Sequence, residues 1–165
     1  MSITPINKER TFGKSTLLVT KTDLKGKITY ANRGFMEIVQ MSEKELVGSP
    51  HNIIRHPDMP KIIFKYLWSY LQDKKEIHAY VKNICKDGSF YWVMANVTPS
   101  YFKGKVIGYH SSRRLPTPES LEIITPLYKE LLQAEKSGGM QASEKIMNTL
   151  LQDKGVNYDE FILSF

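Results

Sequence analysis

The sequence has 165 residues, of which 41% are hydrophobic and 24% are charged. This length and balance fit a single globular domain and exclude both a large multidomain enzyme and a wholly disordered chain. No apolar run reaches the roughly 20 residues of a membrane-spanning helix, and the N-terminus lacks the apolar stretch of a secretory signal, so we expect a cytoplasmic chain. Cys85 is the only cysteine, which excludes an intrachain disulfide and a cysteine-rich zinc site.

The net charge is +6, but it is unevenly distributed. Residues 21–115 contain sixteen basic and eight acidic residues, whereas residues 116–165 contain four basic and eight acidic ones. The lysines of the basic part stand singly among apolar residues, as they do on a solvated surface, and no nucleic-acid-reading motif accompanies them. We therefore expect no nucleic-acid partner.

The pattern divides the chain into three parts. Residues 1–14 are polar without periodicity and predict a flexible N-terminal arm. Residues 15–114 predict one α+β domain, and residues 115–165 predict a helical C-terminal extension that follows a proline-rich breaker. In the domain we expect strands over 16–20, 27–30, 77–85, 90–100 and 106–112.

Capping residues and apolar spacing place the helices between these strands. Asn32 is a favourable N-cap for a helix over 33–40, and Ser42 with Glu45 has capping-box spacing for a short helix that Gly48 ends. Residues 50–60 read as a loop, and residues 61–72 predict an amphipathic helix. The fold class that this order predicts is α+β, a five-stranded antiparallel sheet with helices on one face that encloses a small pocket.

Several segments resemble the PAS family. The resemblance is carried by Asp23–Ile28 with Tyr30–Asn32, and by Lys86–Val93. The more specific segment Gly48–Pro60 resembles the flavin-binding PAS domains of aerotaxis transducers, and the match covers about residues 15–130. As a stand-alone form, the chain resembles the soluble half of bipartite energy-taxis systems of the CetA/CetB type.

The resemblance implies a function. It implies a PAS fold, a bound FAD, and a redox sensor that reports electron-transport or oxygen status in aerotaxis. The partner that it implies is a membrane-bound chemoreceptor-like protein (CetA-like), which would hold the chain peripherally at the inner membrane; a homodimer is also open. An alternative is a cofactor-free PAS adaptor module, and another is a flavin enzyme, although no catalytic motif is present and we expect no enzyme.

In the related domains the Arg-His-Pro-Asp segment holds FAD, which carries over to Arg55, His56 and Asp58. A guanidinium at Arg55 suits a bidentate contact to the pyrophosphate. Asp58 precedes the expected helix over 61–72, where it is placed to cap free N–H groups, and the same helix start attracts phosphate. The alternative is a surface loop with an ordinary N-cap.

Four further residues carry over from the family. Asn83 stands where an amide faces the isoalloxazine, and an amide can both donate to and accept from its pyrimidine edge. An outward-facing strand asparagine is the alternative. Trp68 and Phe64 resemble aromatic residues that line the pocket, although core packing explains them equally well. Asn32 is the fourth, and helix capping is its alternative role.

Histidine and cysteine complete the set of candidates. His110 stands near the position at which light-oxygen-voltage domains sense the flavin, although it departs from the aerotaxis pattern, and a buried strand histidine bonded to a neighbour is its alternative role. Haem is an alternative cofactor, with axial ligands from His51, His56 or His78. Cys85 lies on a strand rather than on a helix over the flavin, so we expect no light-driven adduct.

The C-terminal extension is the expected output element. Leu121, Ile124, Tyr128 and Leu131 form an apolar stripe that packs either on its own domain or on a partner, with Pro126 expected to kink or divide the helix. Residues 137–139 should end it. Since the expected strands are complete by about residue 112, we expect the extension to be dispensable for the sheet.

Overall fold

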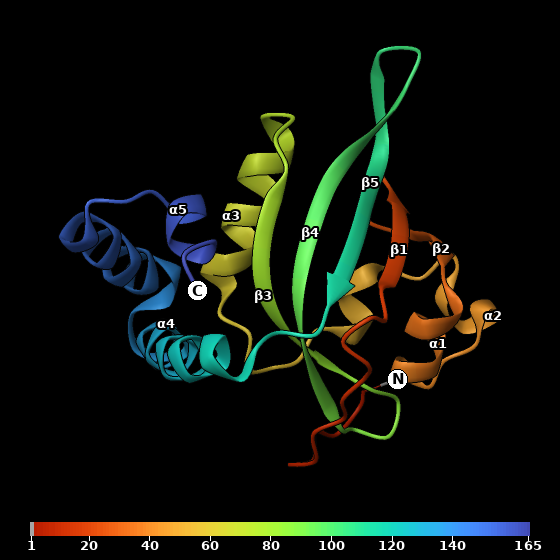
Figure 1. Cartoon of the computed structure of the whole chain (residues 1–165), viewed down its shortest axis with the longest axis horizontal. Coiled ribbons are helices and arrows are strands. Elements are labelled where there is room, and N and C mark those ends of the chain that lie inside the picture. The colour runs from red at the N-terminus through yellow and green to blue at the C-terminus, as the bar shows by residue number, and fades with distance from the viewer. Residues whose placement is uncertain (1) are drawn as a thin grey trace.

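A computed structural model describes residues 2–165 and shows one five-stranded antiparallel sheet (Figure 1). Its strands are β1 (Leu18–Asp23), β2 (Ile28–Ala31), β3 (Ile77–Ile84), β4 (Phe90–Phe102) and β5 (Lys105–Arg114). They lie in the order β2-β1-β5-β4-β3, so that β3 is an edge strand. The expected α+β class and the antiparallel five-stranded sheet are confirmed.

Between β2 and β3 the chain forms a series of short helices that cover one face of the sheet. These are α1 (Arg33–Val39), α2 (Glu43–Leu46), the 3-10 helix η1 (His51–Ile54) and α3 (Lys61–Gln72). The segment expected to be a loop therefore contains η1. Within the described chain, no helix has both the length and the hydrophobicity needed to cross a bilayer.

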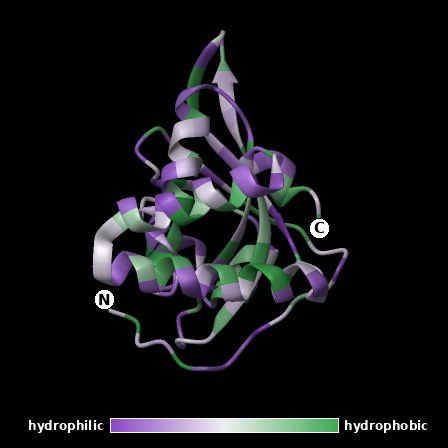
Figure 2. Cartoon of the chain, turned by 90° about the vertical axis from the view of Figure 1, so that its left-hand side faces the viewer, coloured by the Kyte–Doolittle hydropathy of each residue, from purple (hydrophilic) through white to green (hydrophobic). Residues whose placement is uncertain are grey.

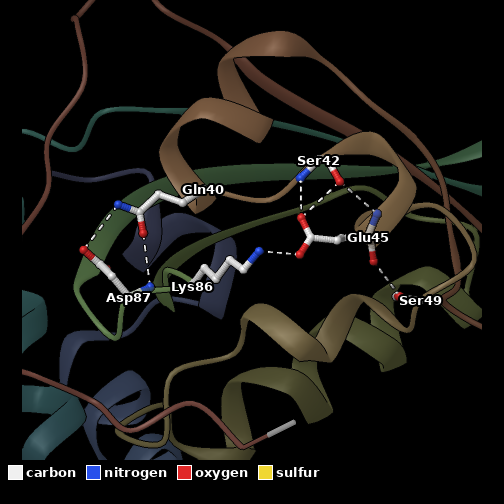
Figure 3. Close-up of polar contacts among 6 residues, drawn as sticks. All are labelled: Gln40, Ser42, Glu45, Ser49, Lys86 and Asp87. Atoms are coloured by element: carbon white, nitrogen blue, oxygen red, sulfur yellow. Dashed lines mark hydrogen bonds and ion pairs between the residues drawn. The ribbon is translucent and has the colours of Figure 1, made fainter.

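Local sequence signals explain the first helices. The Asn32 side chain caps α1 by accepting from the backbone N–H of Phe35, and Ser42 and Glu45 form the expected capping box of α2. Figure 3 shows that Glu45 also pairs with Lys86, while the Gln40 amide bonds to Asp87. Lys86 and Asp87 both lie in the turn between β3 and β4. These bonds therefore fix α1 and α2 to the end of the sheet at which that turn lies.

The N-terminal segment, expected to be a flexible arm, is instead hydrogen-bonded to the β3–β4 turn. The backbone N–H of Phe90 donates to Lys8 O, and that of Arg10 donates to Phe90 O, over 2.9 and 2.7 Å. Gly88 has a φ of +91°, and a Cβ there would lie 2.2 Å from Thr4 O. A side chain at Gly88 would therefore displace the N-terminal segment. Local polarity, which predicted a flexible arm, does not reveal this contact between distant parts of the chain.

The C-terminal region forms α4 (Pro118–Lys154) and α5 (Tyr158–Ile162), which lie beyond β3 and α3 (Figure 1). Gly139, with φ 71° and ψ −172°, interrupts α4 where an end was expected. Pro126 lies inside the helix, and the only non-helical backbone angles within α4 are at Gly139, so Pro126 does not divide it. Figure 2 views the molecule from the side of α4 and α5. The helices there carry both hydrophobic and hydrophilic residues in alternation, as amphipathic helices do.

The extension is part of the core rather than an addition to it. Ile124, Tyr128 and Leu131 of the expected stripe are buried with Trp92 of the sheet, so among the alternatives the stripe packs on its own domain. The Tyr128 hydroxyl donates to Tyr80 O over 2.6 Å, which covers part of the open edge of β3. The extension thus supplies apolar cover and hydrogen bonds to an edge strand, while the expectation that the sheet can form without it stays a prediction.

We expect Leu131→Ala to lower the free energy of unfolding by about 2–5 kcal/mol, because Leu131 is fully buried between α4 and the rest of the core. Leu163→Ala is the matched control, since Leu163 is 58% exposed, and it should change the free energy by less than about 0.5 kcal/mol. Urea unfolding followed by tryptophan fluorescence measures both. An unfolding midpoint of the sheet that is insensitive to Leu131→Ala would show that the extension is an independent unit.

Candidate functional site

A cavity of about 260 Å³ lies between α3, η1 and the inner face of the sheet. Its walls are mostly apolar, from α3 on one side and from β3 and β4 on the other: Phe64, Leu67, Trp68, Leu71, Val81, Ala95 and Val97. Trp68 packs edge-on to Tyr109 of β5, with ring centroids 5.7 Å apart. Two facing apolar walls of this kind suit a flat ring system.

The inner end of the cavity is polar and centres on Arg113 of β5, which is only 4% exposed. Its Nη2 donates to Thr20 Oγ1 over 2.8 Å and to His51 Nε2 over 2.7 Å. Nη1 of Arg113 and Oγ of the neighbouring Ser111 are buried without a hydrogen-bond partner in the described structure. Unpartnered donors beside a cavity are available to a ligand, since leaving them unpaired is costly.

The charge at the polar inner end of the cavity is positive. Burial lowers the pKa of Arg113 to about 10, which leaves the guanidinium protonated at neutral pH. Burial and the Arg113 charge together lower the pKa of His51 to about 3, so His51 is neutral and can accept the Arg113 hydrogen bond. Over residues 2–165, no carboxylate lines the cavity, so the Arg113 charge has no anionic partner there.

Arg55 lies on the open side of the cavity, where Lys25 is the second cation. The guanidinium of Arg55 lies 3.5 Å from the ring centroid of Phe64, and its backbone forms an isolated antiparallel bridge with Asn83 of β3. Partial burial lowers the pKa of Arg55. The loop after η1 is thus fastened to the edge strand, with its cation over an aromatic wall of the cavity.

Asn83 is buried and lines the cavity from β3. Its Nδ2 donates to the Tyr91 hydroxyl over 3.3 Å. The structure therefore brings four of the expected cofactor-binding residues to one cavity: Arg55, Phe64, Trp68 and Asn83. That these residues contact a cofactor stays a prediction.

His56 and Asp58 do not line this cavity. His56 is buried, and its Nδ1 accepts from the backbone N–H of Asp58 over 3.0 Å, while Asp58 pairs with Lys82 Nζ at 3.0 Å. Burial and the Lys82 charge lower the pKa of His56. In this geometry the two residues shape the loop that carries Arg55, and a direct contact with a cofactor remains an untested prediction.

Asp58 does not cap α3, contrary to the expectation above. The N-cap position is Pro60, and the free N–H groups of Lys61 and Ile62 donate instead to the two carboxylate oxygens of Glu135, over 2.8 and 3.0 Å. Glu135 belongs to α4 and also accepts from Ser143 Oγ. A carboxylate already occupies this helix start, so the expected attraction of phosphate there is not available.

His110 and Asn32 also lie away from the cavity. Side chains alternate along β5, so Tyr109, Ser111 and Arg113 face inward while His110 faces the other side of the sheet. The expected position of His110 beside a cofactor ring is therefore a miscount of strand parity. The Asn32 side chain bonds to Leu17 O, to Val19 N and to the α1 cap, which makes it a structural residue.

Sequence reasoning missed the polar inner end of the cavity. Thr20 and Arg113 are 93 residues apart and meet because β1 pairs with β5. Only a correct register of β5, in which Arg113 has the same parity as Ser111, could have indicated this inward arginine. Cys85 is buried in the cluster around α1 and does not line the cavity.

Comparisons with known proteins agree with this architecture. Residues 28–113 match a family model described as the PAS fold. The chain is 43% identical over 116 residues to the aerotaxis receptor of Escherichia coli (strain K12), which covers 70% of this chain and 23% of the receptor. The chain thus spans less than a quarter of the length of that relative.

Solved structures share the fold at low sequence identity. The light-state structure of the blue-light photoreceptor Aureochrome1 LOV has a TM-score of 0.59 and 15% identity, over 68% of this chain and 90% of that one. A light-oxygen-voltage domain studied with a flavin analogue has a TM-score of 0.59 and 16% identity, over 67% and 83%. At this level of identity the similarity establishes the fold alone.

We expect Glu135→Ala to lower the free energy of unfolding by about 0.5–2 kcal/mol, because it removes the acceptor of two helix N–H groups. Glu130→Ala on the same helix is the matched control, since Glu130 is exposed and has no hydrogen bond from its side chain in the described structure. Chemical denaturation measures both changes. Equal effects of the two substitutions would show that the cap contributes nothing.

His51 makes stability depend on pH. Its folded pKa of about 3 lies below the ordinary value of 6.5, so its contribution is complete above pH 6.5 and is lost as the pH falls toward 3. We expect the free energy of unfolding to fall between pH 6 and 4.5 by up to about 1.4 kcal/mol per pH unit from this residue. His51→Gln should flatten this slope in urea titrations at several pH values, and an unchanged slope would contradict the buried neutral state.

Proposed function

The chain belongs to the PAS family, and we propose that it is an FAD-binding redox sensor that reports electron-transport or oxygen status in aerotaxis. The observation that carries the proposal is the cavity, which combines apolar walls, unpartnered donors at its closed end and cations at its open side. The 43% identity to an aerotaxis receptor supports the signalling context. The relative is a receptor and the family is not an enzyme family, so we assign no catalysis.

The residues present fit a flavin. The isoalloxazine is flat and largely apolar on its faces, with acceptor and donor atoms along one edge, which matches the walls from α3 and the polar groups of Asn83, Ser111 and Arg113. At about 260 Å³ the cavity accommodates one ring system and not a whole dinucleotide. The phosphates would therefore lie on the open side, near Arg55 and Lys25.

Each residue then has a definite task. Phe64 and Trp68 would hold the ring and exclude water, and the Asn83 amide would bond to its polar edge. Arg55 would bind the pyrophosphate as a guanidinium fork. When bound, the flavin supplies reversible electron uptake, and the protein supplies orientation and electrostatics.

The contacts around the cavity suggest how a change in the ligand's state is transmitted to the protein surface. The Arg55 loop is bridged to Asn83, and Lys82 next to it pairs with Asp58 of the same loop. The loop leads directly into α3, whose first turn is capped by Glu135 of α4. A ligand state that alters the loop thus acts on α4, whose outer face we propose as the signalling surface for a membrane-bound chemoreceptor-like (CetA-like) partner.

A haem cofactor and a cofactor-free adaptor role both fit the structure less well than a flavin does. Haem would need a free histidine at the cavity, but His51 is the only histidine of the described chain that lines it, and its Nε2 accepts from Arg113. A cofactor-free adaptor would keep Arg113 buried without a counter-charge, which is costly. The cavity therefore favours a flavin over both.

We expect protein purified from its native host to contain non-covalent flavin, identified as FAD by acid release and chromatography. Arg55→Ala should weaken FAD binding by about 10- to 150-fold, which corresponds to the roughly 1.5–3 kcal/mol of a charged hydrogen bond. Arg33→Ala is the control, since Arg33 is an exposed residue of α1 paired with Glu37.

Far-UV circular dichroism should remain native in both variants. Release of haem, or no chromophore after expression with excess flavin, would overturn the assignment of FAD. Full flavin retention by Arg55→Ala would show that the phosphates lie elsewhere.

A further inference from the structure

We propose that the tip of the β4–β5 hairpin is a membrane-contact site, which inserts its aromatic side chains into the interfacial layer of a bilayer that carries anionic lipid. The tip is the segment over residues 101–107. This inference goes beyond the proposed function, in which only a partner protein holds the chain at the membrane, and it does not depend on a bound cofactor.

The hairpin stands clear of the body of the molecule. β3 pairs with β4 only as far as Val97, and β1 pairs with β5 only as far as Gly108, so beyond these residues the described structure continues as a two-stranded ribbon. The ribbon ends at the top of the molecule in both views (Figures 1 and 2). Residues 98–102 span about 16 Å at roughly 3.3 Å per residue, which exceeds the roughly 5–10 Å to which interfacial segments enter a bilayer.

The tip exposes large apolar side chains on both of its faces. Phe102 is 59% exposed, and Tyr101 and Ile107 are each 53% exposed. Tyr101 is paired with Val106 and Phe102 with Lys105, and successive residues of a strand point to opposite faces. A single flat surface of a partner protein would therefore cover only one of the two aromatic rings, whereas a lipid layer that surrounds the tip covers both.

The size of the tip also favours lipid over a protein partner. Stable protein interfaces bury about 800 Å² and roughly 20–30 residues on each side, and the tip is a short segment at the end of a narrow ribbon. A bilayer interface needs no matching surface, and aromatic side chains partition to the level of its headgroups. The exposed rings of the tip are therefore better suited to lipid.

The charge of the tip complements an anionic bilayer. Lys103 and Lys105 lie at the turn, and residues 88–118 include no carboxylate. The turns over 23–27 and 73–76, which lie at the same end of the sheet, contain four lysines and three acidic residues, so they do not cancel this charge. Lysine stems lie along apolar surface while their ammonium groups reach lipid phosphates.

The turn holds these groups in place before any contact is made. Lys103 and Gly104 have φ of +48° and +79°, as in the tight two-residue turns of hairpins. The Nζ of Lys103 lies 5.4 Å from the centroid of the Phe102 ring. Because the ring and the cation are already fixed relative to each other, little conformational entropy is lost on insertion.

The experiment measures co-sedimentation of the full chain with vesicles of phosphatidylcholine alone or with about one third phosphatidylglycerol. We expect wild type to bind the anionic vesicles at least tenfold more tightly than the neutral ones. The double variant Tyr101→Ser/Phe102→Ser removes the two rings. Lys103→Glu/Lys105→Glu reverses the charge of the turn. Each should weaken binding to the anionic vesicles at least tenfold, since it removes the apolar or the charged part of the contact.

Matched control variants change residues of the same kind on the C-terminal helices and after them. Ile123→Ser/Leu163→Ser removes two exposed apolar side chains. Lys145→Glu/Lys154→Glu makes the same change of net charge at exposed positions. Both controls should bind the anionic vesicles within threefold of wild type. All four double variants should unfold thermally as wild type does, because the side chains that they change are exposed.

Fluorescence separates insertion from adsorption to the surface. Phe102→Trp places an indole at the tip, and lipids brominated on their acyl chains should quench its emission more strongly than that of wild type or of Leu163→Trp. Quenching in Phe102→Trp that is no stronger than in Leu163→Trp overturns insertion.

Two sedimentation results would also overturn the proposal. Wild type that binds neither kind of vesicle would show that the tip is not a lipid site and would favour a protein partner. Loss of binding in Lys103→Glu/Lys105→Glu with full binding in Tyr101→Ser/Phe102→Ser would show charge attraction without insertion. None of these outcomes depends on flavin content, so the proposed function stands or fails separately.

Discussion

The open edge of β3 is the constraint on which the rest of the structure depends. An edge strand presents unpaired backbone groups, and each of them needs a partner or exposure to water. Here the Tyr128 and Tyr158 hydroxyls donate to the carbonyls of Tyr80 and His78, and the His56 N–H approaches Lys82 O. The same strand therefore receives the C-terminal helices along one part of its edge and the loop after η1 along another.

This arrangement couples the cavity to the C-terminal helices. Val81 and Asn83 face the cavity from β3. Tyr80 of the same strand faces the other way and packs against α4. Glu135 adds a second link, because it reaches from α4 to the start of α3, whose opposite side forms a wall of the cavity. A change in the cavity that moves β3 or α3 by a small amount must therefore be accommodated by α4, since packed interfaces do not deform continuously.

The extent to which the sequence predicts this structure depends on the range of the interactions. The capping box of Ser42 and Glu45, the Asn32 cap and the helix over 61–72 were predictable, because they depend on residues within a few positions of each other. The cap of α3 was not, because its acceptor lies more than 70 residues away. His110 shows a third case: an error of one residue in strand parity moves a side chain to the opposite face.

The resemblance to a family and the physical reading contribute different parts of the candidate site. Family resemblance indicated Arg55, Phe64, Trp68 and Asn83, which the fold brings to one cavity. It gave no indication of Arg113, whose significance comes only from burial, an unpartnered nitrogen and the lack of a carboxylate along the described cavity wall. Such a charge opposes folding, because burial removes its hydration and no carboxylate of the described cavity wall replaces it, so the stability of the fold does not account for its position.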